Sequence, residues 1–125
     1  MSRQIIAAVD DLFFASKIRA VAEHLGVSIE FARSDQAVRE SLSKETPDLI
    51  ILDLHSQKVP AVALAKEIRA DERLGKVKLV GFFSHVETQM AADAQKAGFD
   101  QVLPRSAFTN RLAEILSESN SGKLD

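Results

Sequence analysis

The chain alternates between short, mainly apolar runs and longer segments whose apolar residues recur every three or four positions. A short apolar run that stops at polar or turn-forming residues is typical of a strand buried on both faces. By this criterion the sequence predicts five strands, at residues 4–9, 28–32, 49–52, 77–83 and 101–103. The run 49–52 is the strongest of these signals, because all of its residues are large and aliphatic.

The segments between the runs have the spacing of amphipathic helices. Phe14 and Ile18 lie one turn apart, and Gly26 stands where that first helix would stop. Of the adjacent Phe13 and Phe14, one should enter the core and the other should begin the helix. Ser34 is placed to cap the second helix. The apolar positions of the later helices are Val38 and Leu42; Val62, Ala65 and Ile68; Met90, Ala91, Ala94 and Ala97; Phe108, Leu112, Ile115 and Leu116.

Strands and helices therefore alternate five times, which indicates a parallel sheet covered by helices on both faces. Because crossovers between parallel strands are right-handed, few topologies remain. We expect an α/β, flavodoxin-like (βα)5 three-layer sandwich with strand order 2-1-3-4-5 and a ligand crevice at the carboxyl ends of strands 1 and 3. The 125 residues suit one domain, expected at 1–117, with 118–125 as a polar C-terminal tail or cut linker.

Composition narrows the function classes. The chain is 46% hydrophobic and 27% charged, with a formal net charge of −2, which does not favour a nucleic-acid-binding surface. Cys is absent, so disulfides, thiolate metal sites and Cys nucleophiles are excluded. No apolar run has the length of a membrane span, and no signal peptide opens the chain. We expect a cytoplasmic domain without membrane contact.

Polar residues follow four of the predicted strands: Asp10 and Asp11, Asp53, Ser84 and Arg105. The carboxyl ends of parallel strands meet at one edge of the sheet, so these side chains should converge. Clustered carboxylates repel one another unless a cation shares the site. Hard oxygen ligands in a small acidic site favour Mg²⁺. An acid pair, a central Asp, a hydroxyl and a cation suit a phosphoryl group carried on a carboxylate.

These motifs resemble the receiver domain of bacterial two-component response regulators, which is CheY-like. The resemblance rests on four segments in order, at residues 9–11, 48–54, 97–100 and 103–105. It implies that Asp53 accepts a phosphoryl group from a phosphohistidine on a sensor histidine kinase or phosphotransfer protein. It also implies that Mg²⁺ is bound directly by Asp11, with Asp10 assisting, by Asp53, and by the backbone carbonyl of His55.

The resemblance further assigns Ser84 as the switch hydroxyl and places Arg105 where the family carries Lys. Arg and Lys differ in reach and geometry, so this exchange is not conservative. Val102 stands where the family has an aromatic switch residue, and His85 stands where it prefers a small one. The stretch that follows Ser84 is one residue shorter than is common, which leaves Phe83 as an alternative occupant of the hydroxyl position.

Three functions remain open from the sequence. The first is a phosphorylation-controlled signalling switch that is no ordinary enzyme, catalysing at most its own phosphorylation and dephosphorylation, and acting on an output domain or downstream protein. The second is a phosphorylation-independent pseudo-receiver that serves as a protein–protein interaction module. The third is a small Mg²⁺-dependent phosphohydrolase, since an Asp nucleophile with acidic metal ligands is also its chemistry.

Overall fold

A computed structural model describes residues 3–84 and 88–117 of the chain. It contains a five-stranded parallel sheet in the order β2-β1-β3-β4-β5. The strands are β1 (Gln4–Ala8), β2 (Ser28–Phe31), β3 (Leu49–Asp53), β4 (Lys78–Phe83) and β5 (Gln101–Pro104). The predicted flavodoxin-like fold and strand order are confirmed.

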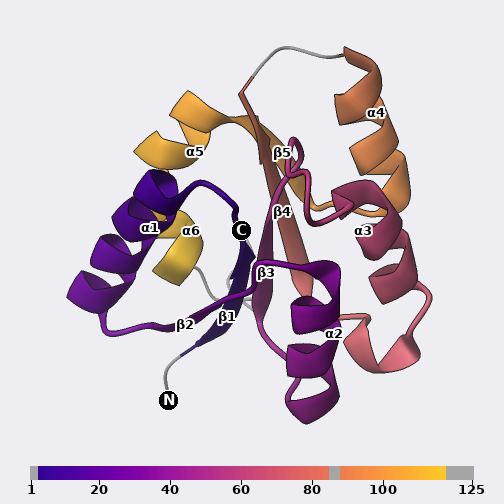
Figure 1. Ribbon diagram of the computed structural model, residues 1–125, viewed down its shortest axis with the longest axis horizontal. Coiled ribbons are helices and arrows are strands. Elements are labelled where there is room, and N and C mark those ends of the chain that lie inside the picture. Colours follow the sequence, from indigo (N-terminus) through magenta and orange to yellow (C-terminus); the bar gives the residue numbers. More distant parts are fainter. Residues whose placement is uncertain (1–2, 85–87, 118–125) are drawn as a thin grey trace, which may run out of the picture.

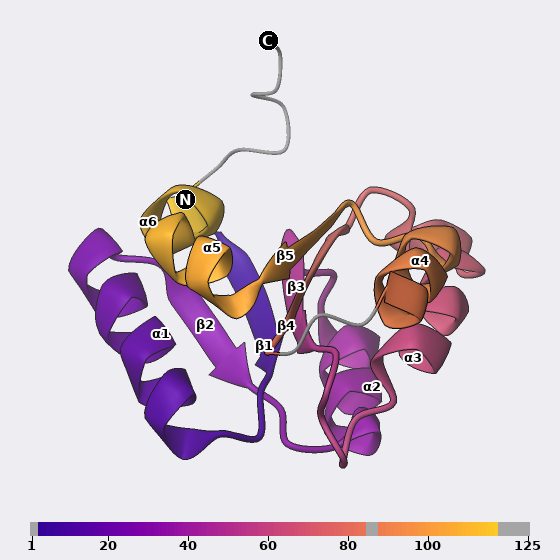
Figure 2. The ribbon, with the colours of Figure 1, turned by 90° about the horizontal axis from the view of Figure 1, so that it is seen from above.

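The helices form one layer on each face of the sheet (Figures 1 and 2). They are α1 (Leu12–Leu25), α2 (Asp35–Lys44), α3 (Ala61–Arg69), α4 (Thr88–Ala97), α5 (Arg105–Asn110) and α6 (Leu112–Ser117), with a 3₁₀ helix at Glu72–Leu74. Seen from above, α1, α5 and α6 cover one face, and α2, α3 and α4 cover the other (Figure 2). Among the described residues, no helix is both long and apolar enough to cross a membrane.

The core consists of two apolar clusters that the sheet separates. Successive residues of a strand point to opposite faces, so Ile5 and Ala7 join the cluster beneath α1 and α6, whereas Ile6 and Ala8 join the cluster beneath α2, α3 and α4. The five residues of β3 are all buried, as expected for the central strand of such a sheet. Double burial explains why β1 and β3 were visible in the sequence as apolar runs, whereas β2 is only partly buried and carries Ser28 and Glu30.

The predicted helix ends are confirmed where local chemistry decides them. Gly26 follows α1 in the left-handed region (φ 72°), and the N–H of Val27 donates to the carbonyl of Ala22. The Ser34 hydroxyl accepts a hydrogen bond from the N–H of Ala37 at 3.0 Å and so caps α2. Phe14 is buried and Phe13 is 91% exposed, so Phe14 is the member of the pair that enters the core.

Two features differ from the sequence prediction. The single last helix is divided at Arg111, whose backbone (φ −104°, ψ 10°) lies outside the helical region and whose N–H donates to the carbonyls of Ala107 and Phe108. The 3₁₀ helix after α3 was not predicted. It begins at an Asx-type cap, in which the Asp71 carboxylate accepts from the N–H of Arg73 at 3.0 Å.

Arg69, the last residue of α3, links this helix to the segments that precede β4 and β5. Its guanidinium donates to the carbonyl of Gly98 at 2.9 Å, to the carbonyl of Val77 at 2.8 Å and to the Asp100 carboxylate at 2.8 Å. The same Asp100 oxygen also accepts from the N–H of Leu79 at 2.8 Å. These bonds hold the end of the sheet that lies opposite the predicted site.

Candidate functional site

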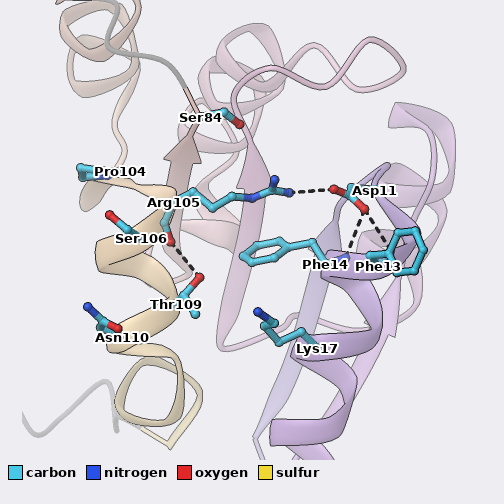
Figure 3. Close-up of a pocket in the computed structure, with 10 residues that line it drawn as sticks. All are labelled: Asp11, Phe13, Phe14, Lys17, Ser84, Pro104, Arg105, Ser106, Thr109 and Asn110. Carbon is cyan, nitrogen blue, oxygen red and sulfur yellow. Dashed lines mark hydrogen bonds and ion pairs between the residues drawn. The ribbon is translucent and has the colours of Figure 1, made fainter.

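Three of the predicted site residues, Asp11, Ser84 and Arg105, line a common cleft of about 640 Å³. The cleft lies between the start of α1 and the start of α5, at the carboxyl ends of the strands (Figure 3). Its other lining residues are Phe13, Phe14, Lys17, Pro104, Ser106, Thr109 and Asn110. The expected convergence at this edge of the sheet therefore occurs for these three side chains.

Asp11 is both a helix cap and an ion-pair partner. One carboxylate oxygen, Oδ1, accepts from the N–H groups of Phe13 at 2.9 Å and Phe14 at 3.2 Å. The other, Oδ2, accepts from Nη2 of Arg105 at 3.1 Å (Figure 3). The N–H of Phe14, followed by the hydrogen bonds from Arg105 and Phe13, lowers the pKa of Asp11 below its usual value. Asp11 is therefore held in its charged form.

Arg105 opens α5 and extends across the cleft toward α1 (Figure 3). The central carbon of its guanidinium lies 4.1 Å from the ring centroid of Phe14 and 5.7 Å from that of Phe82. These rings belong to a buried aromatic group in which Phe82 stacks on Phe108 at 4.9 Å. The planar cation thus rests on an aromatic surface, an arrangement that suits Arg better than Lys.

Asp10 connects the end of β1 to the loop that follows β3. Its Oδ2 accepts from the Ser56 hydroxyl at 2.9 Å and from the N–H of Gln57 at 3.1 Å. Its Oδ1 is buried and has no hydrogen-bond partner within the described part of the chain. The Ser56 oxygen also accepts from the N–H groups of Lys58 and Val59, so the loop is folded around this hydroxyl.

Asp53 is the last residue of β3 and is 9% exposed. Its Oδ1 accepts from the N–H of His55 at 2.9 Å. Burial raises the pKa of Asp53 above its usual value, and the negative charge of Asp10 adds to this effect. The His55 N–H and the positive charge of Arg105 oppose it. Asp53 is therefore a buried carboxylate whose charged form depends on its neighbours.

Ser84 follows β4, is exposed and borders the cleft, whereas Phe83 packs partly buried against the core on the side of α2, α3 and α4. Of these two candidates for the hydroxyl position, Ser84 is therefore the one that borders the cleft, which Ser106 and Thr109 line as well. Val102 lies in β5 and packs against the same cluster as Phe83. His85 lies outside the residues that the structure describes.

Comparison with known proteins identifies the family. The sequence profile of the response regulator receiver domain matches residues 5–117. The chain belongs to this family. Receiver domains are signalling domains of two-component systems rather than enzymes of the ordinary kind. This membership also agrees with the strand order and with the cleft at the strand ends.

One curated relative is the transcriptional regulatory protein ZraR of Salmonella typhimurium, which is 26% identical over 115 residues. The match covers 92% of this chain, but the receiver domain spans only about a quarter of the length of that relative (26%).

Solved structures confirm the receiver fold. The receiver domain of sensor histidine kinase PA1611 from Pseudomonas aeruginosa PAO1, with magnesium coordinated in its active-site cleft, has a TM-score of 0.83 at 18% identity, covering 98% of this chain and 100% of that one. The phosphorylated cyanobacterial phytochrome response regulator RcpA has a TM-score of 0.78 at 18% identity, covering 93% of this chain and 89% of that one.

The receiver domain offers carboxylates of unequal availability to a metal. Among residues 3–84 and 88–117, no group of three or more acidic or His side chains is arranged to hold a metal ion. Mg²⁺ needs only one or two carboxylates, since it retains several waters. The buried, unpartnered Oδ1 of Asp10 and the carboxylate of Asp53 fit that requirement. Asp11 is already paired with Arg105 at 3.1 Å, so a metal at this carboxylate would lie beside the guanidinium.

Sequence reasoning missed several residues around this site, and two of them hold predicted site residues in position. Ser56 anchors Asp10, and the ring of Phe14 supports Arg105. Phe14 was one of two Phe residues expected to supply a core side chain, and helical spacing does not show which cation an aromatic ring will contact. Ser56 lies in a polar loop, and the sequence does not distinguish a Ser that holds another side chain from one that faces solvent.

Proposed function

We propose that this receiver domain is a phosphorylation-controlled switch in which Asp53 accepts a phosphoryl group, with Mg²⁺ bound beside it. The observation that carries the proposal is the environment of Asp53: a buried carboxylate at the end of the central strand, near Asp10, His55 and the charge of Arg105. The magnesium and the phosphorylation named for PA1611 and RcpA are consistent with it.

In the proposed reaction, an oxygen of Asp53 forms a bond to phosphorus while the bond from phosphorus to the imidazole nitrogen of a phosphohistidine breaks. The electron pair of the broken bond stays with the imidazole, which takes up a proton. The N–H of His55 orients the attacking carboxylate, and together with Arg105 it favours the ionised form that can attack. The hydroxyl of Ser84, which borders the cleft, would donate to a phosphoryl oxygen.

Bound Mg²⁺ would neutralise charge that spreads over the transferring oxygens. Asp10 and Asp53 are the side chains proposed to hold it, together with the backbone carbonyl of His55, and Asp11 joins them when it is free of Arg105. The proposed partners are a sensor histidine kinase or phosphotransfer protein upstream, and an output domain or separate protein downstream. A cytoplasmic site of action goes with these partners.

The direct test is incubation with a small phosphodonor such as acetyl phosphate, with Mg²⁺ or with EDTA, followed by intact-mass measurement. We expect one phosphoryl adduct with Mg²⁺ and none with EDTA. Asp53→Asn should abolish the adduct, whereas Asp93→Asn, which removes a carboxylate on α4, should leave it. An adduct of equal yield on Asp53→Asn would overturn the assignment of Asp53.

A second candidate is the phosphorylation-independent interaction module, favoured by the ion pair that Arg105 makes with Asp11. It predicts that partner binding is equally strong for the wild-type protein and for Asp53→Asn, with or without phosphodonor. The phosphohydrolase alternative predicts steady turnover of a phosphomonoester such as p-nitrophenyl phosphate. A receiver domain should show none.

A further inference from the structure

The cation beside Asp11 is supplied by the chain itself. Asp11 directs Oδ2 to Arg105 at 3.1 Å and Oδ1 to the first N–H groups of α1, so both of its oxygens are engaged. The residues in contact are separated by 94 positions and come from α5 and the start of α1. The carboxylate that the family resemblance assigns as the direct metal ligand is therefore already neutralised by a guanidinium.

Contacts of both its side chain and its backbone hold Arg105 in position. On one side the guanidinium lies over the ring of Phe14, whose position is fixed by the buried stack of Phe82 and Phe108. The backbone of Arg105 is also held, because its carbonyl accepts from the Thr109 hydroxyl at 2.8 Å. A planar cation placed on an aromatic face and aimed at a carboxylate loses little freedom when it forms the ion pair.

The contrast with Asp10 supports the same conclusion. Asp10 has no ion pair in the described part of the chain, and one of its oxygens is buried and unpartnered. A divalent cation would find that oxygen available, whereas at Asp11 it would meet the positive charge of Arg105. Two positive charges at one carboxylate repel each other, more strongly in a partly buried cleft than in water.

We propose that the guanidinium of Arg105 acts as a built-in counter-ion that competes with the divalent cation for Asp11, so that full Mg²⁺ binding requires Arg105 to leave this carboxylate. The inference rests on the proposed function only in placing Mg²⁺ beside Asp53, where it would reach Asp11. Arg105 is then a positioning residue that sets the metal affinity of the domain. Its role differs from that of a simple replacement for Lys.

The test is a calorimetric titration of the full chain with Mg²⁺ alone, without phosphodonor. Arg105→Met removes the competing charge and keeps an apolar side chain over Phe14, so it should tighten Mg²⁺ binding by about five-fold or more. The Mg²⁺ affinity of Arg105→Lys should lie between those of Arg105→Met and the wild-type protein, because an ammonium keeps the charge but does not stack on the ring as a planar group does. Arg111→Met removes a guanidinium at the junction of α5 and α6, and its Mg²⁺ affinity should stay within about two-fold of the wild-type value.

A second readout uses the wild-type protein, so the test does not depend on a variant that folds poorly. The Nε–H signal of Arg105 in ¹H–¹⁵N NMR spectra should shift as Mg²⁺ is added, and the Nε–H signal of Arg111 should not. Unchanged or weaker Mg²⁺ binding by Arg105→Met overturns the inference, as does an Arg105 signal that ignores Mg²⁺ while the metal binds. Absence of Mg²⁺ binding by both proteins overturns it as well.

These outcomes separate this inference from the proposed function. Phosphorylation of wild-type Asp53 without any gain in Mg²⁺ affinity for Arg105→Met would refute the counter-ion role and leave the phosphoacceptor role intact. Tighter Mg²⁺ binding by Arg105→Met, with no adduct on Asp53 in either protein, would support the counter-ion role and refute the phosphoacceptor role.

Discussion

Phe108 is the side chain through which α5 contributes to the core, and its replacement gives a sharp test of the packing. It is fully buried (0% exposed), with ring centroids 4.9 Å from Phe82 and 5.8 Å from Phe14. Phe108→Ala should lower the free energy of unfolding by about 3–5 kcal/mol, because it removes buried area and leaves a cavity. Phe108→Leu should cost about 1–2 kcal/mol, since most of the volume remains and chiefly the ring contacts are lost.

The magnitude matters because a domain of this size has a total stability of only about 5–15 kcal/mol. Phe13→Ala is the matched control, since it removes the same ring from a position that is 91% exposed, and it should change the free energy by less than about 0.5 kcal/mol. Urea denaturation followed by circular dichroism suits a chain without Trp or Tyr. A cost below about 1 kcal/mol for Phe108→Ala, or equal costs for both Ala variants, would refute the packing argument.

Three further predictions concern positions outside the cleft. Ser34→Ala should cost about 1 kcal/mol in urea denaturation, because the N–H at the start of α2 loses its acceptor, and Ser34→Thr should recover most of it. Gly98→Ala should lower the free energy of unfolding by about 1–3 kcal/mol and lower the melting temperature. The φ of Gly98 is 109°, which disfavours a side chain, and an added Cβ would lie 2.5 Å from an Arg69 carbon. An unchanged melting temperature would contradict this. Arg39 lowers the pKa values of Asp35 and Glu67 below their usual 3.8 and 4.5. The ion pairs of Arg39 therefore stabilise the folded state fully above these usual pKa values, and this stabilisation is lost as the pH falls through the lowered pKa values of the folded state. Arg39→Met should therefore reduce stability at pH 7 and leave it unchanged in strong acid, and a loss of equal size at both pH values would show that the ion pairs are not its cause.

The fold could be predicted from the sequence because its determinants are local. The doubly buried strand β3 is apolar at every position before Asp53, and Gly26 and Ser34 end or begin helices through their own backbone and side-chain chemistry. Connection rules then leave few ways to order five parallel strands. The division of the last helix at Arg111 escaped prediction, because amphipathic spacing continues across the break.

The candidate site was predictable only in part, for a different physical reason. The position of each strand end showed which residues would gather, and Asp11, Ser84 and Arg105 do share one cleft. Position along the chain does not show which partners a charged side chain selects. The choice of Arg105 by Asp11, and of Ser56 by Asp10, depends on packing between segments far apart in the sequence.

The bonds of Arg69 have a mechanical consequence for this domain. They fasten the end of α3 to the amino ends of β4 and β5, through the carbonyls of Val77 and Gly98 and the carboxylate of Asp100. Arg69 thus ties α3 to the same two strands whose carboxyl ends lead to Ser84 and Arg105, so one guanidinium helps to fix the strands on which those two residues depend.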